Sequence, residues 1–171
     1  PWVIHLQGIR TSRLVTFRSV QAAESAGLTS LAVTYRGTGD GPVTRVSYLG
    51  HREWADLDDA IKFARTHGAT EVYVVAWSMG AGVALELLRR SPHAFERLAL
   101  ISPATNWRAI VRRGVDRAGL PGSLASMVTW VLKSPIGSKI VGMPSPLDLG
   151  ALDWTAGYDL DIPTLVLHSE G

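Results

Sequence analysis

Cysteine is absent from the 171 residues, which excludes disulfides, a thiol nucleophile and thiolate metal sites. No apolar run reaches the roughly 18 residues that a membrane-spanning helix needs, so no stable insertion into a membrane is expected. The net charge is also small, because 17 Lys and Arg residues nearly balance 15 Asp and Glu residues. Such a small excess gives little long-range field, and nucleic acid is not an expected partner. No His, Asp and Glu residues recur at metal-ligand spacing, and we expect neither a metal nor another cofactor.

Hydrophobic residues make up 46% of the sequence and charged residues 19%, which is ordinary for a globular protein with a core. The chain begins at Pro1-Trp2 without an initiator Met or a signal-like segment, and we interpret this start as a cut into a longer gene product. The compartment stays open, with the cytoplasm favoured, and so does the oligomeric state.

Short apolar segments alternate with segments of helical periodicity. The apolar segments carry few polar residues, as strands buried on both faces do, and Gly or Pro separates them from the helical ones. This alternation predicts an α/β protein, with a mostly parallel sheet and crossover helices. We expect strands at 2–6, 28–35, 71–76, 97–101 and 163–168, and helices within 12–26, 54–67 and 79–90.

The stretch 103–161 breaks this alternation. It contains several Pro and Gly residues, with helical pieces expected near 107–117 and 124–132. We interpret it as a helical cap inserted over one end of the sheet, within a single domain that spans 1–171.

A buried strand runs directly into Ser78, and a helix rich in small residues starts at once. The segment 76–80, Ala-Trp-Ser-Met-Gly, is a variant of the nucleophile elbow G-x-S-x-G with Ala76 in place of the first Gly. Such a serine must occupy a sharp, strained turn, and small residues two before and two after it let strand and helix approach closely. We predict Ser78 as a nucleophile and the N–H of Met79 as an oxyanion donor at the helix N-terminus.

The same turn has a plainer interpretation, because Ser is a common N-cap that joins a strand to a helix. A dinucleotide site is disfavoured. Leu85 and Pro42 occupy the positions at which the two G-x-G segments, 80–82 and 37–39, would need a third small residue.

These features together resemble the α/β-hydrolase superfamily. The segment 4–10 is similar to the family's His-Gly loop after its third strand, which implies that the N–H of Ile9 is the second oxyanion donor. Gln7 stands where that loop usually has His. Segment 35–39 is similar to the family's Arg-Gly-x-Gly loop, and segment 163–171 to its seventh strand. Within the superfamily the sequence looks akin to bacterial serine aminopeptidase-like and prolyl-oligopeptidase-like groups.

The resemblance implies a serine hydrolase that cleaves an ester, thioester or amide bond of a small-molecule or peptide acyl substrate through an acyl-enzyme at Ser78. Trp77 and Gln7 are candidate pocket residues. In the family's chain order the triad acid would follow Gly171 and the His would come later. We therefore expect a fragment truncated at both ends and without turnover. A non-catalytic binding protein, and an acyltransferase or lyase on the same scaffold, stay open as alternatives.

The remaining polar and aromatic candidates have plainer interpretations. The five His residues are interpreted as surface or loop-end groups, with a supporting role kept only for His168 near the family's acid turn. Four late carboxylates and a basic helix face are interpreted as solvated or capping groups, and three Trp residues as cap core or acyl-pocket lining. These groups are Asp148, Asp153, Asp159 and Asp161; Arg108, Arg112, Arg113 and Arg117; and Trp107, Trp130 and Trp154.

Overall fold

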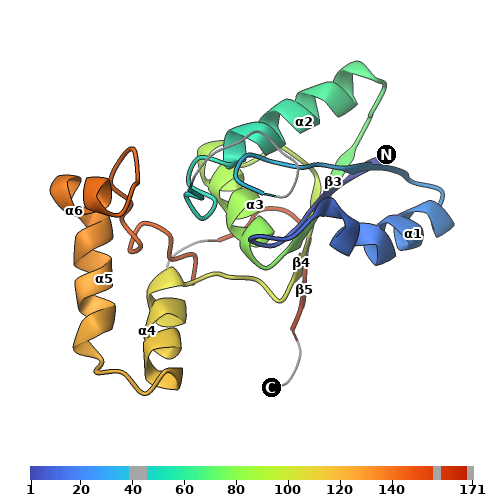
Figure 1. Ribbon diagram of the computed structural model, residues 1–171. Helices are drawn as coiled ribbons and strands as arrows, with labels where there is room; N and C mark the ends of the chain where they lie inside the picture. The colour runs from blue at the N-terminus through green and yellow to red at the C-terminus, as the bar shows by residue number, and fades with distance from the viewer. Residues whose placement is uncertain (39–45, 156–158, 169–171) are drawn as a thin grey trace. The chain divides into compact units, whose positions relative to one another are not determined.

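The computed structural model describes residues 1–38, 46–155 and 159–168 (Figure 1). The chain divides into two compact units, Pro1–Pro103 with Asp159–Gly171, and Ala104–Tyr158. Each unit is described by itself below.

The first unit is built on a five-stranded sheet in which every neighbouring pair of strands is parallel, in the order β2-β1-β3-β4-β5. Parallel neighbours need crossover connections, and helices supply them. The predicted fold class is therefore confirmed. The strands are β1 (Trp2–Leu6), β2 (Thr29–Ala32), β3 (Val72–Trp77), β4 (Arg97–Ile101) and β5 (Thr164–Leu167).

Strand β2 is shorter than the sequence predicts. The apolar run 28–35 indicates one long strand, but pairing with β1 ends at Ala32. The side chain of Tyr35 is nevertheless buried, with 1% of its surface exposed. The other residues of the run are half-buried or exposed, because β2 is the first strand in the sheet order and, among the described residues, has a neighbour on one side only. The last residues of the run leave the sheet for a loop.

Helices cover both faces of the sheet (Figure 1). His5 of β1 contacts Ser19 of α1 (Phe17–Ser25), whereas Leu6, which points the opposite way, lies beside Gly80 of α3 (Met79–Arg90). Helix α2 (Trp54–Thr66) packs on α3, and a 3-10 turn (Arg13–Thr16) precedes α1. All residues of α3 from its first to Leu88 are buried, so this helix is the centre of the core.

The described residues of the second unit form three helices, α4 (Trp107–Arg117), α5 (Ser123–Lys133) and α6 (Pro135–Ile140). The sequence predicts the first two but not α6. The oxygen of Ser134 accepts a 3.3 Å hydrogen bond from the Gly137 N–H, and Pro135 occupies the first turn, so a local cap rather than an apolar period starts this short helix. Among the described residues, no helix is long and apolar enough to cross a membrane.

Candidate active site

Ser78 alone joins β3 to α3, in a backbone conformation that L-residues seldom adopt. Its φ is 49° and its ψ −112°. A non-glycine residue in such a region costs of the order of 1–3 kcal/mol, and such strain clusters at functional sites. The Ser78 N–H donates a 3.0 Å hydrogen bond to the Ile101 carbonyl at the end of β4. The strained turn is thus held at the carboxyl end of two central strands.

The hydroxyl of Ser78 does not act as a helix cap. Its side chain makes no capping hydrogen bond, and the Ala81 N–H donates instead to the Ser78 main-chain carbonyl at 3.1 Å. Ser78 is partly exposed, and among the described residues nothing hydrogen-bonds its hydroxyl. The N-cap interpretation of this serine therefore does not describe its side chain.

Gly8 lies directly against Ser78. A methyl group at Gly8 would come within 3.3 Å of the Ser78 Cβ and 3.8 Å of its Oγ. On the other side of the turn, a methyl group at Gly80 would come within 2.8 Å of the Gln7 carbonyl oxygen. The loop after β1 and the start of α3 therefore meet beside the serine. A side chain at position 80 would collide with the Gln7 backbone, whereas one at position 8 would crowd the Ser78 side chain.

The two amides predicted as oxyanion donors belong to these two segments. Met79 is the first residue of α3, where a helix leaves its N–H without a partner in the preceding turn. Ile9 follows Gly8, and 36% of its surface is exposed.

Gln7 and Trp77, the tentative pocket residues, differ in environment. The Gln7 side chain is fully buried, and its Nε2 donates to the Thr38 hydroxyl at 2.9 Å. Trp77 is partly exposed, while its Nε1 is buried and has no hydrogen-bond partner among the described residues.

One histidine interpretation is wrong. His5 is fully buried within β1, neither on the surface nor at a loop end. Its ring nitrogens lie 2.9 Å and 3.0 Å from the hydroxyls of Ser19 and Ser30, and burial lowers the pKa of His5 to about 4. Its two partners are 14 and 25 residues away along the chain, so no local sequence pattern predicts these contacts. Of the others, His51 lies 3.5 Å from the carboxylate of Glu86, and His67 stacks on Phe63.

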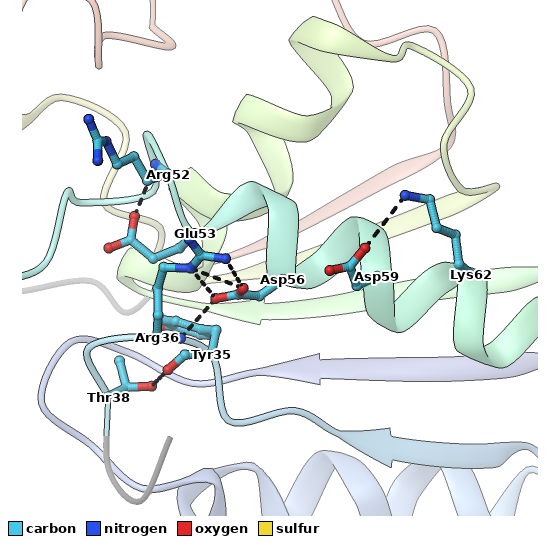
Figure 2. A network of polar contacts seen from close by, with 8 residues as sticks. All are labelled: Tyr35, Arg36, Thr38, Arg52, Glu53, Asp56, Asp59 and Lys62. Carbon is cyan, nitrogen blue, oxygen red and sulfur yellow. Dashed lines mark hydrogen bonds and ion pairs between the residues drawn. The ribbon is translucent and has the colours of Figure 1, made fainter. Parts of the chain in front are cut away.

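A polar network that the sequence analysis missed surrounds the segment after β2 (Figure 2). Arg36 donates its backbone N–H and its guanidinium to Asp56 of α2. Burial opposes ionisation of Asp56, yet the hydrogen bonds and charge of Arg36 hold its pKa below the usual value. The predicted Arg-Gly-x-Gly loop is thus anchored to α2 through its arginine, although residues 39–45 lie outside the described part of the chain.

The carboxylate of Glu53 is buried more completely than that of Asp56, with 1% of the residue's surface exposed. It accepts hydrogen bonds from the N–H groups of Tyr48, Gly50 and Arg52 and from the Ser47 hydroxyl, at 2.7–3.2 Å. The Ser47 hydroxyl lies 3.3 Å from the sulfur of Met79. Glu53 therefore shapes a loop that touches the first residue of α3.

Two of the four late carboxylates, Asp148 and Asp153, lie in local contacts of the second unit, whereas Asp159 and Asp161 belong to the first. Asp148 pairs with Lys133 at 2.7 Å, and Asp153 accepts from Asn106 and Thr155. Trp107 and Trp154 are buried there, whereas 69% of Trp130 is exposed. Residues 169–171, which precede the position predicted for the triad acid, lie outside the described residues.

An apolar cavity of ≈ 550 Å³ lies on the sheet face that α1 partly covers. It is lined by Val3, Ala22, Tyr73, Leu98 and Leu165 among others, and by none of the predicted site residues. The geometry around Ser78, rather than this cavity, marks the candidate site.

Comparisons with known proteins bear on the family and the fold of this chain. Residues 3–167 match the model of a family described as the alpha/beta hydrolase family. No curated protein sequence matched the chain. Three solved structures are similar: an esterase from Exiguobacterium antarcticum (TM-score 0.59, 16% identity, 96% of this chain and 71% of that one), an esterase from Rhodococcus sp. ECU1013 (0.57, 20%, 97% and 71%) and a meta-cleavage product hydrolase from Pseudomonas fluorescens IP01 (0.53, 18%, 97% and 70%).

The chain spans only part of its structural relatives. It covers 70–71% of those three chains and 48% of a deformylase chain from Pseudomonas putida S16. At these identities the likeness shows the fold alone. The family model, by contrast, matches nearly the whole chain, and on that evidence the chain belongs to the alpha/beta hydrolase family.

Proposed function

We propose that this chain carries the nucleophile and the oxyanion hole of a serine hydrolase. The observation that supports this most strongly is the Ser78 turn, where a positive φ coincides with a hydroxyl that caps nothing. A strained residue persists only where the surrounding structure holds it, and a strand-to-helix serine held in this way is the geometry of a nucleophile elbow.

In this proposal Ser78 attacks the carbonyl carbon of an ester, thioester or amide, and the leaving group departs with a proton from the general acid–base. Water then cleaves the acyl-enzyme and restores the hydroxyl. The N–H groups of Met79 and Ile9 stabilise the oxyanion of each tetrahedral intermediate. Removal of one such donor typically costs about 3–4 kcal/mol of transition-state stabilisation.

The general base is proposed to lie outside the described residues. Ser78 Oγ is hydrogen-bonded to no described histidine, and His5, the one with a buried ring, is engaged with Ser19 and Ser30. A serine hydroxyl needs a neighbouring base to become a nucleophile. We therefore assign neither the triad His nor its acid to a described residue.

A kinetic comparison of two serine variants tests the proposal. In the protein that contains this chain, Ser78→Ala is expected to reduce hydrolysis of p-nitrophenyl esters by at least about 10³-fold. Ser102→Ala is the matched control, because Ser102 also has a positive φ (46°) and follows the adjacent strand β4. Unchanged turnover in Ser78→Ala, or equal losses in the two variants, would overturn the assignment.

The type of bond that is cleaved and the molecule that accepts the acyl group are tested separately. The esterases among the structural neighbours make small esters the first substrates to try, and aminoacyl p-nitroanilides test the aminopeptidase-like alternative. Product analysis with added alcohol acceptors separates hydrolysis from acyl transfer. A protein that binds these compounds without turning them over would instead be the non-catalytic member of the fold.

A further inference from the structure

The Tyr35 hydroxyl is tied to the back of the proposed oxyanion loop. It donates a 2.5 Å hydrogen bond to the Gln7 carbonyl oxygen, and only 1% of Tyr35 is exposed. The bonded carbonyl belongs to the peptide that leads into Gly8, so the contact acts on the loop two residues before Ile9. Tyr35 lies in the loop after β2, 28 residues further along the chain.

The same carbonyl is bounded on a second side by α3. A methyl group at Gly80 would lie 2.8 Å from the Gln7 oxygen and 2.9 Å from the Leu6 Cβ. The Gln7 carbonyl therefore has two fixed neighbours, the Tyr35 hydroxyl and the first turn of α3. Together they fix the distance between the oxyanion loop and the helix that carries the other donor.

Tyr35 is itself held in place. The Thr38 hydroxyl donates to the Tyr35 carbonyl at 2.6 Å (Figure 2), and Gln7 Nε2 donates to the same Thr38 oxygen at 2.9 Å. The neighbouring Arg36 is paired with Asp56 of α2. Burial, with the negative charge of Glu53, raises the pKa of the Tyr35 phenol. The phenol therefore stays protonated, and remains a donor, throughout the neutral pH range.

We propose that Tyr35 is a positioning residue of the active site: by its bond to the Gln7 carbonyl it sets the separation of the Ile9 and Met79 amides. This inference rests on the proposed function. Tyr35 is placed behind the loop and touches neither of the reacting atoms. Its loss should therefore weaken stabilisation of the tetrahedral state more than binding of the ground state.

The test is Tyr35→Phe in the protein that contains this chain, assayed with p-nitrophenyl esters and with a boronic acid that forms a tetrahedral serine adduct. We expect kcat to fall about 10- to 100-fold and the boronate Kd to rise in parallel, with KM within about twofold. Tyr73→Phe is the matched control, because the Tyr73 hydroxyl bonds to Glu71 near the start of β3. It should leave all three values unchanged.

The outcomes separate the two proposals. If Ser78→Ala abolishes turnover but Tyr35→Phe matches the wild type, or changes only KM, the positioning role is wrong and the nucleophile stands. If the wild type neither hydrolyses esters nor binds the boronate at Ser78, both proposals fall. Should Tyr35→Phe not fold by circular dichroism, Thr38→Val removes the hydroxyl that holds Tyr35. Thr38→Val should lower kcat, by less than is expected for Tyr35→Phe. A change in KM alone would overturn the positioning role of Tyr35.

Discussion

The α-carbon of Gly50 packs against the peptide of Gly82 in α3. A methyl group at Gly50 would lie 2.7 Å from the Gly82 carbonyl carbon and 2.9 Å from its oxygen. Gly50 also has a φ of 102°, which favours glycine for a second, independent reason. Two backbones therefore meet without intervening side chains, one turn into the helix that Ser78 introduces.

Gly50→Ala should destabilise the protein strongly, because the new methyl group collides with backbone atoms that cannot rotate away. We expect a loss of at least about 3 kcal/mol in the free energy of unfolding, from overpacking together with left-handed strain. Gly68→Ala is the control, since Gly68 has a similar φ of 92° but nothing within 4 Å of the added carbon. It should cost about 1–2 kcal/mol. Equal losses in urea denaturation would show that the Gly50–Gly82 contact has no energetic consequence.

Glu53→Gln should destabilise the loop 47–53 although the side chain keeps its size. The carboxylate accepts three backbone N–H groups and a hydroxyl, whereas the amide would turn its own N–H₂ toward some of these donors. We expect a loss of about 2–4 kcal/mol, measured by thermal or urea unfolding. Glu96→Gln is the control. It alters a half-exposed carboxylate just before β4 and should cost less. A Glu53→Gln protein as stable as the wild type would contradict the account of this loop.

Gly80→Ala tests the close approach of α3 to the loop after β1. The added methyl group would press on the Gln7 carbonyl and the Leu6 side chain, which displaces the loop that carries Ile9. Ester hydrolysis should fall by about 10²-fold, the cost that a displacement of about 1 Å carries. Gly114→Ala, in the middle of α4 with nothing within 4 Å, should leave activity intact. Full activity in Gly80→Ala would mean that the contact of α3 with the loop after β1 does not determine the geometry of the active site.

Stability should depend on pH through His5. Its pKa is about 4 in the folded protein and near the ordinary 6.5 in the unfolded chain, so the unfolded chain binds more protons between these values. The contribution is complete above about pH 6.5 and is lost as the pH falls toward 4, by up to about 3 kcal/mol. His5→Gln should flatten that part of the stability–pH curve, measured by urea unfolding at a series of pH values. An unchanged curve in His5→Gln would refute the assignment.

Much of the fold follows from local patterns in the sequence. The helix predicted over 79–90 and the strand over 97–101 match the structure at both ends, because an apolar run or period is bounded there by glycine, proline or polar residues. The serine turn was predicted for a similar reason, since the small residues at 76 and 80 and the serine between them are contiguous. Short-range steric preferences determine these elements and this turn, so a single sequence is enough to predict them.

The supporting contacts could not be predicted in this way. The bond from Tyr35 to Gln7 spans 28 residues, and that from Arg36 to Asp56 spans 20, so neither leaves a periodic trace. His5 resembles an ordinary strand-end residue until Ser19 and Ser30 are brought to its ring. Buried polar pairs of this kind form only once the sheet order is fixed, and the sequence alone does not state that order.

The central claim, that Ser78 is an activated nucleophile, is tested most directly by covalent labelling. The protein that contains this chain is treated with a fluorophosphonate, digested, and analysed by mass spectrometry for the modified peptide. We predict a single adduct on Ser78, absent from Ser78→Ala and retained in Ser102→Ala. No adduct on Ser78 in the folded wild-type protein, or labelling that persists in Ser78→Ala, would contradict the claim.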